Sequence, residues 1–169
     1  VFALARHRFL WLLVLMISAT FTGNIIKRFE DVLQSVVSLT AFIPMLMDSG
    51  GNAGSQSSTL VIRGLALGDI ELNDIFKVVW KELRVSSIVG LALAIINFIR
   101  IYYFEKMDLN ICITVCITLF FTIILAKVVG GILPIVAKKL KLDPAIMASP
   151  LITTIVDAVA LLIYFSIAT

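Results

Sequence analysis

The chain has 169 residues, of which 60% are hydrophobic and 15% are charged, and its formal net charge is +3. Soluble domains carry roughly 25% charged residues, so this composition excludes an ordinary soluble domain and predicts an integral membrane protein surrounded by lipid. The charged residues lie mostly between the apolar runs and form no basic arm, so we expect no nucleic-acid partner.

The apolar runs are too long and too continuous for the strands of a membrane barrel, so the chain is predicted to be an all-α bundle. The first run covers residues 9–26 and follows Arg6, His7 and Arg8. No small-residue cleavage site follows this run, so we do not expect a secretory signal. Because the chain begins with Val1 instead of Met, we expect a membrane domain that belongs to a longer protein.

The second run, residues 32–67, is much longer than the roughly 20 residues that cross a bilayer. We therefore expect a tilted helix, or a break or kink at Pro44 or at Gly50 and Gly51. Within this run, residues 48–59 are small or able to form hydrogen bonds. At helical spacing, one face of this block carries five polar side chains, namely Asp48, Asn52, Ser55, Gln56 and Thr59.

The polar block has two interpretations. In the first, the block serves helix packing. Gly50 and Gly54 stand four residues apart, an arrangement that lets membrane helices approach closely, and the polar groups form hydrogen bonds with neighbouring helices. Alternatively, the polar face lines a polar pathway through the membrane, and the cost of burying ionisable groups favours this interpretation. Both can be true on different faces of the same helix.

Residues 68–84 mix charged and apolar side chains, which suits a helix on the membrane surface or one that leads into the next span. We expect these charges to be solvated and not to form a site. The third span is predicted over residues 85–104 and the fourth over residues 111–136. Lys127 lies inside the fourth span, where it could extend toward the interface or pair with a carboxylate such as Asp48.

Two cysteines, Cys112 and Cys116, lie one turn apart in the fourth span. Two thiols alone would build only half of a tetrahedral metal site, so we expect them to be small apolar filler.

The fifth span begins after Asp143 and Pro144, since proline is accepted in the first turn of a helix, and runs to the end of the chain. Asp157 stands inside it. Helical steps back from Asp157 place four residues on the same face, namely Thr154, Thr153, Pro150 and Ser149. A charged Asp in a span costs about 2.5–3.5 kcal/mol, so two of them, Asp48 and Asp157, in the two spans with polar stripes predict a cation pathway.

With five spans, most lysine and arginine residues outside the spans lie on the same side of the membrane as the N-terminus. This asymmetry predicts a cytosolic N-terminus, and five spans then place the C-terminus on the extracytosolic side of the plasma membrane.

Two segments resemble a known family. The sequence IPMLMDSGGNAGSQSSTLVIRGLALGDI, from Ile43 to Ile70, is similar to the second-helix signature of the MgtE family of magnesium channels. The sequence DPAIMASPLITTIVDAVALLIYF, from Asp143 to Phe165, resembles the fifth helix of that family. Both segments occur in the right order, and the plan of five spans agrees with the family.

The resemblance implies a homodimer whose pore lies on the two-fold axis and is lined by the second and fifth helices. It implies that Asp157 holds hydrated Mg²⁺, the transported ion, with Thr153 beside it. It also implies cytosolic sensor domains in the full-length protein that are absent from residues 1–169. The remaining residues expected to line the pore are those of the two polar faces, namely Asp48, Asn52, Ser55, Gln56, Ser149 and Thr154.

The sequence thus predicts the permeation domain of a channel for magnesium or another divalent cation. The alternative is a secondary active divalent-cation transporter, because such proteins also use broken helices and carboxylates near the bilayer midplane. A purely structural membrane protein is the third possibility. We do not expect an enzyme, because the spans contain no serine–histidine or paired catalytic carboxylate arrangement and His7 is the only histidine.

Overall fold

The computed structural model describes the backbone of residues 2–35 and 37–168. The side chains of residues 2–5, 7, 8, 10, 11, 32, 33, 35 and 146–149 lie outside this description, so the predictions for His7 and Ser149 fall on undescribed side chains. Every described element is helical. They are α1 (Phe2–Arg28), α2 (Glu30–Ser35), the 3₁₀ helix η1 (Val37–Phe42), α3 (Ile43–Leu67), α4 (Ile75–Ile99), the π-helical segment η2 (Arg100–Phe104), α5 (Leu109–Lys139) and α6 (Pro144–Ala168).

Five of these helices are long, and they correspond to the five predicted spans. Among the described residues, three segments are long and apolar enough to cross a membrane: Ile75–Phe104, Leu109–Lys139 and Pro150–Ala168. The other two long helices, α1 and α3, contain 27 and 25 residues. At 1.5 Å of rise per residue each exceeds the roughly 30 Å of a hydrocarbon core. The prediction of an all-α membrane protein is confirmed.

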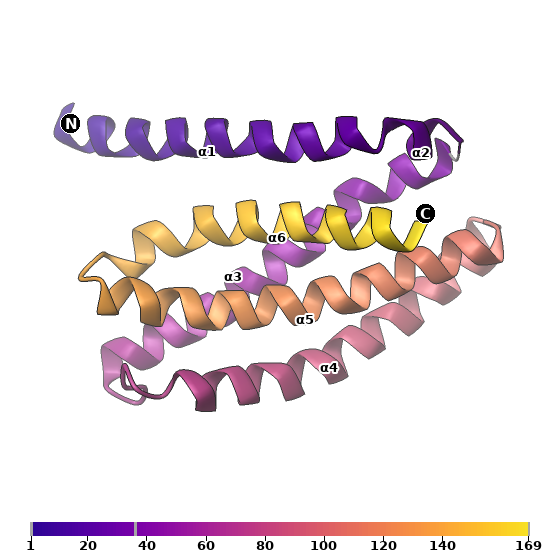
Figure 1. The fold of residues 1–169 in the computed structure, drawn as a ribbon. Helices are drawn as coiled ribbons and strands as arrows, with labels where there is room; N and C mark the ends of the chain where they lie inside the picture. The colour runs from indigo at the N-terminus through magenta and orange to yellow at the C-terminus, as the bar shows by residue number, and fades with distance from the viewer. Residues whose placement is uncertain (1, 36, 169) are drawn as a thin grey trace.

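The helices pack around α5, which contacts α3, α4 and α6. Figure 1 shows α5 and α6 side by side, with α1 along one edge of the bundle, α4 along the other and α3 crossing obliquely. Helix α1 packs on α6 and lies at the periphery. Helix α1 begins and α6 ends at opposite ends of the bundle, as five spans require (Figure 1).

The predicted break in the second run occurs at its Pro44 end. The 3₁₀ helix η1 stops at Phe42, and α3 begins at Ile43 with Pro44 in its first turn, where the missing N–H costs no hydrogen bond. The Tyr164 hydroxyl, buried on α6, donates a hydrogen bond to the Leu39 carbonyl at 2.9 Å and so attaches η1 to the bundle. Helix α3 continues without interruption through Gly50 and Gly51.

The glycines of α3 serve close packing. A Cβ atom on Gly130 of α5 would overlap the backbone carbonyl of Gly54, so the two backbones meet at this point. A Cβ atom on Gly50 would stand 2.5 Å from the Val156 side chain of α6 and 2.8 Å from that of Thr122 of α5. The glycine face of α3 therefore packs closely on α5 and α6, as the packing interpretation predicted.

The charged stretch over residues 68–84 divides into a loop and the start of α4. The loop begins at Gly68, whose φ of +82° ends α3 in a left-handed conformation that suits glycine. From Ile75 onward the chain is already in α4, so this stretch leads into the next span and does not form a separate surface helix. The expectation that its charges are all solvated is wrong, because Glu82 is buried against α3 and α5.

Candidate cation site

The polar face of α3 borders a cleft that it shares with α6. This cleft has a volume of about 490 Å³ and brings Asp48 and Asp157 together, although 109 positions separate them in the chain (157 − 48). Asn52 and Ser55 continue the lining on α3, and Thr153 lies one turn before Asp157 on α6. The remaining lining residues are Ile43, Pro44, Met47 and Gly51. The cleft therefore combines two carboxylates with an amide and hydroxyls.

Two further clefts extend this one along α3. The next has a volume of about 720 Å³ and is lined by Asn52, Ser55, Gln56, Thr59 and Leu60. The third, of about 310 Å³, is lined by Ser55, Ser58, Thr59, Ile62 and Ala145. Neighbouring clefts share lining residues, so the three form one row, which we call the polar groove. It follows α3 from Pro44 to Ile62 and meets the first turn of α6 at Ala145.

Asp48 is oriented by its own helix. The Asn52 side-chain amide donates a hydrogen bond to the Asp48 carboxylate at 3.0 Å, across one turn of α3. Both side chains are exposed in the single chain. This bond uses one of the two carboxylate oxygens of Asp48, and Asp48 lines the groove, where a cation or its water shell can approach.

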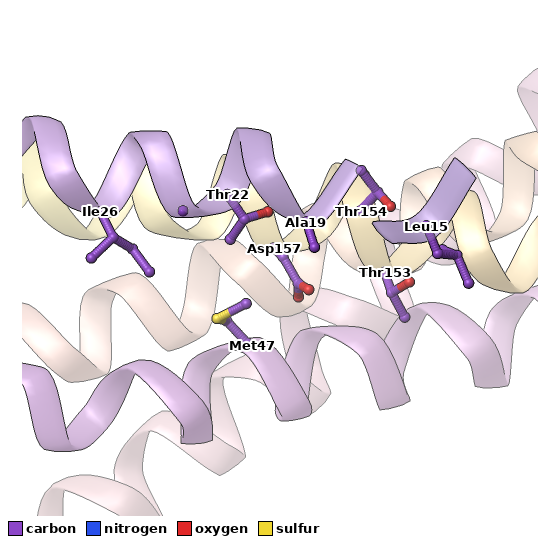
Figure 2. A pocket seen from close by; sticks show the side chains of 9 residues that line it. Leu15, Ala19, Thr22, Ile26, Met47, Thr153, Thr154 and Asp157 are labelled. Carbon is purple, nitrogen blue, oxygen red and sulfur yellow. The ribbon is translucent and has the colours of Figure 1, made fainter. Parts of the chain in front are cut away.

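Asp157 occupies a different setting, in the middle of α6. No hydrogen-bond donor from the described residues is bound to its carboxylate, and the side chain is partly buried between two hollows. One hollow is the polar groove. The other is a cavity of about 420 Å³ on the α1 side, with Leu15, Ala19, Thr22, Gly23 and Ile26 of α1, Met47 of α3, and Thr153, Thr154 and Asp157 of α6 in its lining. Figure 2 shows the Asp157 side chain between α1 and α3, near Met47.

Pro150 explains the local arrangement of the threonines before Asp157. The hydroxyls of Thr153 and Thr154 donate hydrogen bonds to the Pro150 carbonyl, at 2.9 Å and 3.0 Å. Their protons are thus directed along the helix toward the Pro150 carbonyl. Thr153 borders both hollows, whereas Thr154 borders only the cavity on the α1 side.

The structure brings together most of the residues predicted for the site. Asp48, Asn52, Ser55, Thr153 and Asp157 line one cleft, and Gln56 lines the next. Thr154 lies on the far side of Asp157, and the Ser149 side chain is outside the described part. Lys127 is buried on α5, and none of the described carboxylates lies within 4.0 Å of its amine, so it does not pair with Asp48.

Two residues near Asp157 were missed by sequence reasoning. Met47 precedes Asp48 on α3 and lines both hollows, and Thr22 of α1 is buried at the edge of the α1 cavity. A signal for Thr22 was present, because four polar residues interrupt the first run, namely Ser18, Thr20, Thr22 and Asn24. No sequence signal distinguishes Met47 from the apolar residues beside it.

The fold and the groove define a class of protein: a helical membrane protein with a carboxylate-lined polar groove between two spans. Residues 43–167 match the MgtE family, described as "Divalent cation transporter", and the chain belongs to this family. The chain is similar to the magnesium transporter MgtE of Thermus thermophilus, with 38% identity over 165 residues, and to that of Bacillus subtilis, with 39% identity over 165 residues. The magnesium transporter MgtE of Enterococcus faecalis is 27% identical over 164 residues.

These alignments cover 97% or 98% of this chain but only 36% of each relative. The chain therefore spans little more than a third of the length of the curated relatives it matches. All three relatives are named as transporters and not as enzymes.

Proposed function

We propose that residues 1–169 form the permeation domain of a magnesium channel, with Mg²⁺ as the transported ion. The observation that carries this proposal is the position of Asp157, whose carboxylate borders the polar groove without a hydrogen bond from any described residue. A charged side chain inside a span is costly and is by default a candidate for a functional site, of which an ion pathway is one kind. The names of the relatives support magnesium as the ion.

The chemistry of the groove suits an ion that keeps its water. Mg²⁺ loses water reluctantly and is usually held by one or two carboxylates with several waters retained. Asp157 supplies the charge, and the hydroxyl oxygen of Thr153 offers an acceptor for a hydrogen of the water shell. Asp48, Asn52, Ser55 and Gln56 offer the same kind of contact along the groove. Selection then depends on the fit of the hydrated ion to the groove.

A homodimer would complete the pore. The polar groove is lined by α3 and α6 of one chain and is open along its length, so it provides one wall of a pathway. A second copy related by a two-fold axis would supply the opposite wall and a second Asp157. Two facing carboxylates attract a divalent cation more strongly than a monovalent one, because the attraction scales with the charge of the ion.

The protein would lie in the plasma membrane, in contact with lipid, with a cytosolic N-terminus and an extracytosolic C-terminus. The greater length of the relatives supports further domains in the full-length protein, and we assign cytosolic sensor domains to that part. Permeation requires no catalytic reaction, so the domain would not act as an enzyme.

A secondary active divalent-cation transporter is the second candidate, since the interrupted helix formed by η1 and α3 beside a carboxylate is also found in transporters. Single-channel currents that grow linearly with voltage favour the channel. Saturable uptake that depends on a counter-ion gradient in sealed vesicles favours the transporter.

The test is Mg²⁺ uptake by liposomes that contain the full-length protein. Asp157→Asn is expected to lower uptake at least about a hundredfold, because it removes the charge on which the ion depends. Asp69→Asn is the matched control, since Asp69 is an exposed carboxylate in the loop after α3. Normal Mg²⁺ uptake in Asp157→Asn would contradict the proposal.

A further inference from the structure

Glu82 is a buried carboxylate that the cation pathway does not use. It lies on α4 with 6% of its surface exposed, and it accepts a hydrogen bond from the hydroxyl of Ser57, which is fully buried on α3. The oxygen atoms are 2.5 Å apart, a distance typical of a bond to an ionised acceptor. Because an unpaired carboxylate in a span is costly, this contact has a structural or functional role.

Ser57 lies on the side of α3 that faces away from the polar groove. A helix turns by about 100° per residue, so Ser57 is rotated by roughly 140–200° from Asp48, Asn52, Ser55 and Thr59. The hydrogen bond to Glu82 therefore attaches α3 on the side opposite the groove. Along the helix axis, the bond lies beside the residues of α3 that line the groove. A contact at this place fixes the rotation of α3 about its own axis.

The hydrogen bond joins α3 to α4 beside α5, the helix on which both of them pack. Gly130 meets the backbone of Gly54, and the next residue, Gly131, faces Glu82. A Cβ atom on Gly131 would stand 3.2 Å from Cγ of Glu82, so the glycine gives the Glu82 side chain room to reach Ser57. Lys127, the buried cation of α5, lies one turn before Gly131 on the same face.

We propose that Glu82 is a positioning residue of the cation pathway: by holding Ser57, it sets which side chains of α3 face the polar groove. The effect on ion passage rests on the proposed function, since a rotated α3 would carry Asp48 and Asn52 away from the ion. Its physical content, the orientation of α3, does not depend on conduction.

The experiment measures that orientation directly. Asn52→Cys is introduced into the full-length protein in liposomes, and the rate of its reaction with a charged, water-soluble thiol reagent is recorded. The native Cys112 and Cys116 are buried and contribute little background. Ser57→Ala, Glu82→Ala, Glu82→Gln and the double variant of Ser57→Ala with Glu82→Ala are then compared. Ser86→Ala is the control, because Ser86 is fully buried on α4 and, within the described part of the chain, its hydroxyl bonds only to the Leu83 carbonyl of its own helix.

Ser57→Ala and Glu82→Ala are each expected to slow the reaction of Cys at position 52 about tenfold, as loss of a hydrogen bond to a charged group predicts. The double variant is expected to be no slower than either single variant, because both remove the same contact. Glu82→Gln, whose amide oxygen still accepts from Ser57, is expected to stay within about twofold of the parent, as is Ser86→Ala.

Two results would overturn the inference: an unchanged reaction rate in Ser57→Ala, or additive effects in the double variant. The Ser57→Ala arm remains informative if Glu82→Ala fails to fold. Mg²⁺ uptake is measured separately on liposomes that hold the parent protein with Asn52 intact, which separates the two proposals. A changed reaction rate in a protein that does not take up Mg²⁺ would support the positioning contact and contradict the channel.

Discussion

The two carboxylates that lie on opposite sides of α3, Asp157 of α6 and Glu82 of α4, have opposite environments. On the groove side, Asp157 borders two hollows and is bonded to no donor from the described residues. On the other side, Glu82 is buried, accepts a hydrogen bond from Ser57 and is packed against Gly131. Asp157 lies in the middle of a helix that crosses the membrane, where a charge costs about 2.5–3.5 kcal/mol on the insertion scale, and Glu82 lies in the first third of another such helix.

The difference shows what makes a membrane carboxylate available to an ion. Glu82 already has a protein donor in Ser57 and is packed against Gly131, which suits the positioning role proposed for it. Asp157 has a cleft and lacks a donor from the described residues, so water or a cation must solvate it. The side chain alone does not distinguish these roles, and the packing of the neighbouring helices does.

The largest effect is expected from Gly130→Val. This substitution would push α3 away from α5 and so disturb both the groove side of α3 and the side that faces Glu82. Any Cβ atom on Gly130 overlaps the Gly54 carbonyl, and a backbone cannot move aside as a flexible side chain can. We expect the free energy of unfolding in detergent to fall by about 3 kcal/mol or more, with loss of Mg²⁺ uptake. Gly23→Val on α1 is the control, since nothing lies within 4 Å of a Cβ atom there. Equal stability of the two variants would disprove the close contact of α3 with α5.

The next effect concerns the buried side alone. Ser57→Ala leaves the Glu82 carboxylate buried without its donor, so we expect the free energy of unfolding to fall by about 2 kcal/mol. Combining Ser57→Ala with Glu82→Met removes the charge as well and should recover most of that loss. Thermal unfolding in detergent measures both. A double variant less stable than Ser57→Ala would mean that Glu82 has another favourable partner.

The fold was largely predictable from the apolar runs, because each run long enough to cross a bilayer contains one long helix. The break in the second run was foreseen only as a choice between two places. Gly50 packs against the side chains of Val156 and Thr122, which keeps α3 continuous, so the interruption occurs before Pro44. A sequence shows that a glycine is present, but it does not show whether a neighbouring helix fills the space beside it.

The site was predictable to the extent that helical spacing determines it. Spacing placed Asp48, Asn52 and Ser55 on one face, and the structure sets that face against Asp157. Helical spacing alone did not identify Glu82 as a buried residue. The run of charged residues around it, residues 68–84, places some side chains toward solvent and others toward the bundle. A signal existed, since Glu82 shares a face with Val78, Ser86 and Gly90, all of which are buried.

Within the groove, the comparison predicts a smaller role for Asp48 than for Asp157. Asp48 is exposed in the single chain and already accepts a hydrogen bond from Asn52. Because an exposed charge is screened by salt, we expect Asp48→Asn to lower Mg²⁺ uptake by only about threefold at physiological ionic strength. The effect should grow when salt is reduced. A loss as large as that of Asp157→Asn would place the ion at Asp48 instead.

The smallest effect is expected outside the membrane, at the start of α4. Asp74 forms an ion pair of 2.6 Å with Lys77, whose side chain is 84% exposed. The hydrogen bond from Lys77, helped by the Glu71 backbone N–H, holds the pKa of Asp74 below its usual value of 3.8. Its stabilisation is therefore present at neutral pH and is lost as the pH falls through that lowered pKa.

Asp74→Asn should consequently lower the Tm in detergent slightly at pH 7. The difference from the parent should begin to shrink below a pH of about 5, where the carboxylate starts to be protonated in the unfolded chain, and should be lost once the pH is below the lowered pKa of the folded state. It should also shrink in about 0.5 M salt, because exposed ion pairs are screened. A Tm difference that persists under both conditions would show that Asp74 acts through neutral hydrogen bonds at the helix terminus and not through its charge.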